Sequence, residues 1–143
     1  ILTLDTLASG SYDVYAMAYG PGGMSMGGTE GWSGPFSFTM SAPAVPALPT
    51  SLSVIDANAS TLSWAHSDGA TWHQVWIGTL EPNTTAYMAW VEAETLHCGS
   101  GNCTLTTDLP AGSWHWFIQA YSPGGISTGG LDGWVEGPTF SVN

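Results

Sequence analysis

The 143-residue chain contains no lysine and no arginine, against 11 aspartate and glutamate residues, and its formal net charge is -11 at pH 7. Binding to nucleic acid and docking on anionic lipid both depend on cationic side chains. We therefore expect no nucleic-acid partner. No apolar run of about 18 residues or more occurs, so we also expect no membrane insertion.

Charged residues of either sign are scarce at 8%, whereas 43% of the residues are hydrophobic and 12% are aromatic. Disordered chains have the opposite composition, so the chain is expected to fold around an apolar core. Its start, Ile1-Leu2-Thr3-Leu4-Asp5, lacks the basic and then apolar pattern of a signal peptide. We interpret the chain as processed, or as a piece of a longer one.

The chain repeats itself at an offset of 102 residues. Residues 1–32 and 103–134 share 13 identities, including Tyr19, Pro21 and Trp32 with their counterparts Tyr121, Pro123 and Trp134. Composition bias would produce glycine matches but not these aromatic and proline matches in register. The sequence therefore predicts two copies of one repeat.

The spacing of the copies predicts an unequal division of the chain. Residues 41–49, Ser-Ala-Pro-Ala-Val-Pro-Ala-Leu-Pro, have the composition of a linker between domains. Residues 50–143 then form a complete domain, and residues 1–40 form the C-terminal half of a preceding repeat, its last three strands.

Short alternating patterns predict that the fold is all-β. In 72–78, for example, Trp72, Gln74 and Trp76 alternate with His73, Val75 and Ile77. About seven strands in about 100 residues are typical of an antiparallel Greek-key β-sandwich. The expected strands are 51–55, 60–64, 72–78, 85–91, 103–109, 113–121 and 135–142.

Three motifs resemble bacterial or archaeal fibronectin type III-like modules of the immunoglobulin-like sandwich class. They are Trp64 at the end of the second strand, 69–72 (Gly-Ala-Thr-Trp) at the start of the third, and 109–116 leading into Ala120-Tyr121. The resemblance implies tandem β-sandwiches and says almost nothing about activity. The long Gly-rich turn 123–133 and the cysteine pair depart from the family pattern.

Half a sandwich would expose its inward-facing side chains, an apolar patch that soluble monomers rarely tolerate. Two explanations stay open. The missing strands belong to the same long tandem array, or another subunit donates them and a filament results. The candidate interface residues are Leu2, Leu4, Val14, Ala16, Phe36 and Phe38.

Cys98 and Cys103 flank a four-residue Gly/Asn turn, which favours a disulfide and an oxidising compartment. The alternative is a metal site with His97 and His115, but structural zinc normally has four ligands, and none is spaced that way. We therefore expect no metal. Three acceptor sequons begin at Asn58, Asn83 and Asn102 and predict N-glycosylation at exposed turns.

The eight tryptophans raise the possibility of sugar binding, but most lie in mid-strand, where packing explains them. Only Trp72 and Trp90 are expected to be free to stack on a sugar ring. Enzyme signals are weak: Glu92 and Glu94 could form a carboxylate pair on one strand face, and 66–68 (His-Ser-Asp) has triad residue types without triad spacing. A calcium site of Asp56, Asp68, Asp132 and Glu136 stays open.

These features predict an extracellular, cell-surface structural or adhesive glycoprotein, not an enzyme and without a cofactor. It would be a segment of a microbial surface filament or tandem-repeat adhesin, with copies of itself or adjacent repeats as partners. The alternative is a carbohydrate-binding accessory module of a secreted polysaccharide-active enzyme, with glycans as partners.

Overall fold

A computed structural model of the chain describes residues 7–96, 98 and 101–143 and divides the chain into two compact units, Ile1–Ala42 and Pro43–Asn143. All regular elements of the described residues are β-strands joined by turns. Within those residues, no helix has the length and apolar character that crossing a membrane requires.

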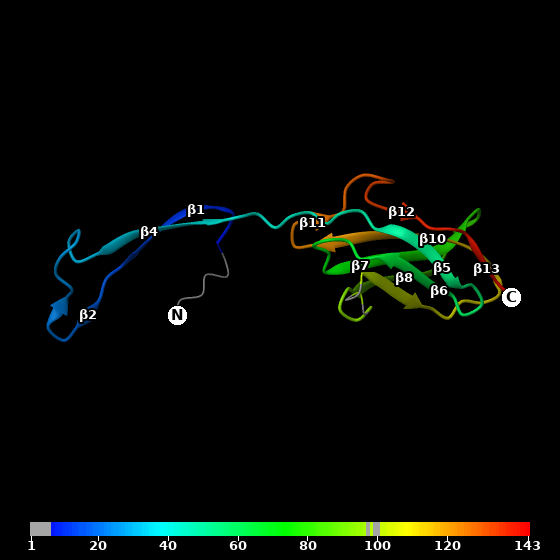
Figure 1. Cartoon of the computed structure of the whole chain (residues 1–143), viewed down its shortest axis with the longest axis horizontal. Helices are drawn as coiled ribbons and strands as arrows, with labels where there is room; N and C mark the ends of the chain where they lie inside the picture. Colours follow the sequence, from blue (N-terminus) through cyan, green and yellow to red (C-terminus); the bar gives the residue numbers. More distant parts are fainter. Residues whose placement is uncertain (1–6, 97, 99–100) are drawn as a thin grey trace. The chain divides into compact units, whose positions relative to one another are not determined.

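The first unit is built on one long hairpin (Figure 1). Strand β1 (Gly10–Ala16) pairs antiparallel with β4 (Ser33–Met40), and the short strands β2 (Tyr19–Gly20) and β3 (Gly23–Met24) pair with each other between them. In the described part of this unit, each sheet has two strands, so β1 and β4 have no second layer to pack against.

The second unit contains two antiparallel sheets. The smaller sheet has the order β5-β6-β9, from β5 (Thr50–Asp56), β6 (Thr61–Ala65) and β9 (Asn102–Thr106). In the larger sheet, β7 (Trp72–Leu80) lies between β8 (Asn83–Glu92) and β10 (Gly112–Ser122). The other edge of β10 pairs with β11 (Gly125–Ile126), β12 (Val135–Glu136) and β13 (Phe140–Val142).

The chain passes between the two sheets after β6, after β8 and after β9. This is an antiparallel β-sandwich, as the sequence predicted. The last expected strand, 135–142, is divided in two at Gly137-Pro138 because proline has no N–H to donate to the ladder.

The two faces of β7 that the alternation predicts differ in burial, although Gln74 on the outer face is buried as well. His73, Val75 and Ile77 on β7 are fully buried, whereas Trp72 and Trp76 between them remain partly exposed on the outer face. Trp64 of the small sheet and Trp116 of the large sheet meet across the core with their rings 6.3 Å apart. Apolar burial of this kind, at about 25 cal/mol per Å², is what stabilises the second unit.

Part of the segment expected to be a linker packs on the second unit. The Ser122 hydroxyl donates a hydrogen bond to the Ala44 carbonyl at 2.6 Å, and Pro46 and Pro49 are buried. Residues 43–49 therefore lie against the sandwich rather than standing free of it.

Candidate functional site

Cys98 and Cys103 form the predicted disulfide, with 4.3 Å between their Cα atoms. Cys103 lies on β9 and is fully buried, and Cys98 lies in the β8–β9 connection and is nearly so. The bond thus joins this connection to the small sheet.

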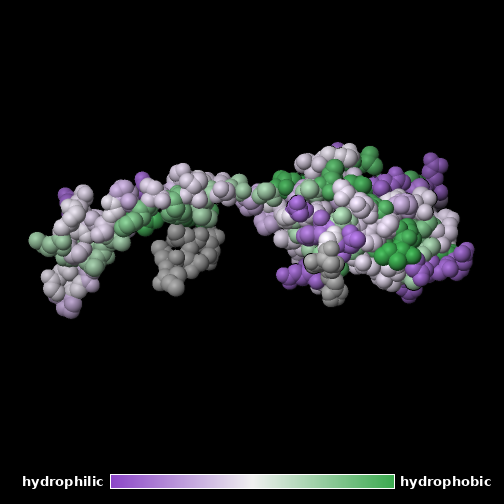
Figure 2. All heavy atoms as spheres, viewed as in Figure 1, coloured by the Kyte–Doolittle hydropathy of each residue, from purple (hydrophilic) through white to green (hydrophobic). Residues whose placement is uncertain are grey.

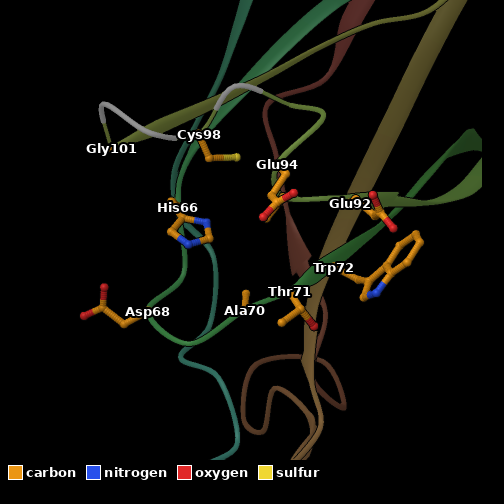
Figure 3. A pocket seen from close by; sticks show the side chains of 10 residues that line it. His66, Asp68, Ala70, Thr71, Trp72, Glu92, Glu94, Cys98 and Gly101 are labelled. Atoms are coloured by element: carbon orange, nitrogen blue, oxygen red, sulfur yellow. The ribbon is translucent and has the colours of Figure 1, made fainter.

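An open pocket of about 940 Å³ lies beside the disulfide. In Figure 3 the Cys98 sulfur and the Glu94 carboxylate lie on the same side of the His66 ring, and the Asp68 carboxylate points away from it. Because the chain has no lysine or arginine, the carboxylates at the pocket give it a negative potential. The pocket is lined by His66, Asp68, Ala70, Thr71, Trp72, Glu92, Ala93, Glu94, Cys98 and Gly101.

Glu92 and Glu94 do not form the expected carboxylate pair on a strand. Strand β8 ends at Glu92, and Glu94 lies in the following turn, where Leu96 N–H donates to the Glu92 carbonyl. Both residues line the pocket, but the strand alternation that would align their carboxylates stops before Glu94.

A histidine pair lies behind the pocket. The rings of His66 and His73 are 5.8 Å apart, and His73 is fully buried against the edge of Trp64. The pKa of His73 is lowered from 6.5 to about 4, mainly by burial and also by the nearby His66, because two imidazolium rings repel. His73 is therefore neutral at pH 7.

These histidines belong to a cluster that the sequence did not predict. Among the described residues, His66, His73 and Cys103 are the one group of at least three potential metal-ligating side chains, with ligand atoms within 4.8 Å of one another. His115 instead lies 3.2 Å from the Glu136 carboxylate, and His97 is outside the described residues. The only sequence signal for the cluster was the inward position of His73 on β7.

Aromatic side chains gather on the outer face of the large sheet. Trp72, Trp90 and Tyr121 line an open hollow of about 280 Å³, with Trp90 edge-on to Tyr121 at 5.9 Å. The expected pair, Trp72 and Trp90, thus lie together, and Tyr121 joins them because it pairs with Trp72 across β7 and β10. A second hollow of about 370 Å³ is lined by Trp76, Leu80, Asn83, Phe117, Leu131 and Trp134.

The β1–β4 hairpin of the first unit carries apolar side chains on one face. Val14 lies opposite Phe36, and Tyr12 lies opposite Phe38 with the two rings stacked at 5.6 Å. Phe36 is 63% exposed, Ala16 is exposed, and Val14 and Phe38 are half-buried. Figure 2 shows hydrophobic residues at the surface of this hairpin. Leu2 and Leu4 lie outside the described residues.

The same local structure occurs in both units at the offset of 102. Tyr12 pairs with Phe38 as Trp114 pairs with Phe140. In the Gly-rich turns, the Ser25 hydroxyl donates to the Gly31 carbonyl at 2.7 Å, and the Ser127 hydroxyl donates to the Gly133 carbonyl at 2.9 Å.

The turn glycines Gly31 and Gly133 have φ of 86° and 89°, and a Cβ on either would lie 2.2 Å from a serine carbonyl oxygen. Only glycine fits these two equivalent positions. The units differ in burial, because Trp116, Ile118 and Phe140, the second-unit equivalents of Val14, Ala16 and Phe38, are at most 7% exposed.

The three sequon asparagines, Asn58, Asn83 and Asn102, are all exposed in the second unit. Exposure is a condition for glycosylation, which itself stays a prediction.

No family model matches the chain, and no curated protein matches it. A solved structure described as FN3tt is similar with a TM-score of 0.45 and 17% identity, over 70% of this chain and 97% of that one. The FN1-FN3 domains of chicken CNTN1 are similar with a TM-score of 0.44 and 14% identity, over 93% of this chain and 44% of that one. The sheets and core described above, not these similarities, establish the sandwich.

Proposed function

We propose that the chain is a segment of an extracellular structural or adhesive protein, a microbial surface filament or tandem-repeat adhesin made of consecutive β-sandwiches. The observation that carries the proposal is the exposed apolar face of the β1–β4 hairpin, whose counterpart in the second unit is buried. We assign no catalytic role to the chain.

The hairpin needs a second layer. Two-stranded hairpins are marginally stable in water on their own, and their open edges pair readily with other chains. In the second unit, the sheet β5-β6-β9 covers the inner face of β10 and β13, and β7 and β8 extend the sheet of β10. The matching cover for residues 1–40 is a set of strands of the same kind, from an adjacent repeat or from another copy of the protein.

Association through this face can be tested with a matched pair of substitutions on β4. Phe38→Asp places a carboxylate on the apolar face, and Thr39→Asp places one on the exposed opposite face. Leaving a charge unpaired in an apolar contact costs roughly 3 kcal/mol, so Phe38→Asp should weaken association about a hundredfold, and Thr39→Asp should leave it nearly unchanged.

Sedimentation velocity over a range of concentrations, with electron microscopy of the concentrated samples, measures this association. Equal effects of the two substitutions would contradict a role for the apolar face. A wild-type chain that stays monomeric at every concentration would contradict donation between chains and would assign the covering strands to the same chain.

The second candidate function is carbohydrate binding, which the hollow lined by Trp72, Trp90 and Tyr121 favours. Aromatic faces stack on sugar rings, and the polar pair Gln74 and Gln119 lies beside them on the same sheet face. If this surface binds a polysaccharide, Trp90→Ala should reduce binding about tenfold or more in affinity electrophoresis, and Leu131→Ala, in the other hollow, should not. Equal migration of wild type and Trp90→Ala on all polysaccharides tested would exclude the role.

A further inference from the structure

Three side chains beside the disulfide, His66, His73 and Cys103, form a cluster with the chemistry of a metal site. The His66 Nδ1 lies 3.9 Å from the Cys103 sulfur, and a ring nitrogen of His73 lies within 4.8 Å of both. Cys98 is bonded to Cys103 and adds the second sulfur. The four residues come from the β6–β7 connection, β7, the β8–β9 connection and β9, so the fold brings together two imidazoles and two sulfurs from distant parts of the sequence.

The ring nitrogens of His73 provide a second observation at this cluster. The side chain is 0% exposed, and neither ring nitrogen has a hydrogen-bond partner among the described residues. A buried polar group without a partner costs about 1–3 kcal/mol, and most buried polar atoms in proteins are paired. Packing against Trp64 accounts for the ring's position but does not satisfy its nitrogens.

We propose that reduction of the Cys98–Cys103 disulfide turns this cluster into a site for a thiophilic metal ion of the Zn²⁺ class. The ligands are the two cysteine thiolates and one ring nitrogen each of His66 and His73. Two cysteines and two histidines are a common tetrahedral ligand set for zinc. The site exists only in the reduced chain, because the disulfide sulfurs carry no thiolate charge.

Reduction of the Cys98–Cys103 disulfide requires a two-electron reductant, which is a dithiol or a phosphine. The reductant supplies two electrons to the sulfur–sulfur bond, which breaks, and two protons are taken up to give two thiols. The dithiol becomes a cyclic disulfide, or the phosphine becomes its oxide with an oxygen from water. On binding, the metal ion replaces both thiol protons, which pass to water.

The ligand atoms of the two histidines and Cys103 need only small movements to reach the separations of a tetrahedral zinc site. Zinc–sulfur bonds of about 2.3 Å and zinc–nitrogen bonds of about 2.0 Å put tetrahedral ligand atoms roughly 3.3 to 3.8 Å apart. The ligand atoms of His66, His73 and Cys103 are already within 4.8 Å of one another, so each must move by about an ångström or less. The Cys98 sulfur must move away from the Cys103 sulfur, from bonding distance to roughly 3.8 Å, once the bond between them is broken. The open pocket beside His66 provides an entry path, and Glu92 and Glu94 on its wall attract cations.

Cobalt titration of the full chain tests the proposal, because Co²⁺ in a tetrahedral thiolate site has visible absorption that hydrated Co²⁺ lacks. The chain is reduced with a phosphine under nitrogen, and Co²⁺ is added with the oxidised chain in parallel. We expect one Co²⁺ per reduced chain with tetrahedral bands and sulfur-to-cobalt charge transfer, displacement by Zn²⁺, and no such spectrum from the oxidised chain.

A matched histidine pair locates the site. His66→Ala should weaken Co²⁺ binding about tenfold or more, and so should Cys103→Ser. His115→Ala removes another partly exposed histidine, on β10, and should bind Co²⁺ as the wild type does. Tryptophan fluorescence reports whether each reduced variant is folded, and Zn²⁺ should protect both wild-type thiols from alkylation.

Three results would overturn the proposal. They are a reduced wild-type chain that gives no tetrahedral cobalt spectrum, an oxidised chain that gives the same spectrum, and equal binding by His66→Ala and His115→Ala. If reduction unfolds the second unit, Zn²⁺ must restore its tryptophan fluorescence, and failure to do so counts equally against the site.

Discussion

Acidification from pH 7 to pH 4 should lower the free energy of unfolding of the second unit by about 3 kcal/mol through His73 alone. Burial holds the pKa of this ring at about 4 in the folded chain, against 6.5 when unfolded. Between these values the unfolded chain binds a proton that the folded chain does not. Stability therefore falls as pH decreases through this window, and the loss is complete below about pH 4.

Urea unfolding followed by tryptophan fluorescence at several pH values, with the disulfide intact, measures this loss. His73→Phe keeps a ring in the core but cannot titrate. Between pH 7 and pH 4, its free energy of unfolding should therefore fall by about 3 kcal/mol less than that of the wild type. Carboxylates contribute equally to both proteins. His115→Phe, at a partly exposed histidine, is the matched control for replacing a histidine outside the core. A His73→Phe chain that retains the full acid dependence would rule out His73 as its source.

Completion of the first repeat should turn residues 1–40 into part of a stable sandwich. Because the offset is 102, residues 43–102 placed directly before residue 1 continue into it in register. Ile1 stands where the complete repeat has Cys103, so the added Cys98 is changed to Ser. The added strands, equivalent to β5 to β8, then supply the part of the sandwich that residues 1–40 lack.

Phe38 and its equivalent Phe140 provide the energetic comparison. Phe140 is buried against the core, and removing its ring should cost about 3–5 kcal/mol. In the completed repeat, Phe38→Ala should lower the free energy of unfolding by a similar amount. Loss of the separate unfolding transition of that repeat measures the effect. In the original chain the same substitution should leave the unfolding of the second unit unchanged. A completed chain with a single transition, insensitive to Phe38→Ala, would show that the added strands do not pack on the hairpin.

Local patterns were enough to predict the strands and their faces. Alternation on β7 predicted that His73, Val75 and Ile77 share one face, which the structure buries, and the repeat predicted that Tyr12 and Trp114 occupy equivalent positions. Both signals are periodic, so they can be read from the sequence without knowledge of the fold. Glu94 was misplaced because the turn that ends β8 at Glu92 leaves no break in the alternation.

The functional clusters depended on contacts that no sequence period records. Cys103 lies 37 residues from His66, and their approach requires β6 and β9 to pair at one register. Tyr121 joins Trp72 only through the register of β10 on β7. A one-residue slip of either pair would turn these side chains to the other face, so strand pairing alone decides both clusters.

Hydrogen exchange of the β1 and β4 amides tests the central claim most directly, namely that residues 1–40 are the last strands of a sandwich repeat and need a covering sheet. Mass spectrometry compares the original chain at low concentration with the chain completed by residues 43–102. We predict slow exchange of β1 and β4 in the completed chain, about a hundredfold or more slower than in the original. Equal exchange in the two chains would contradict the account.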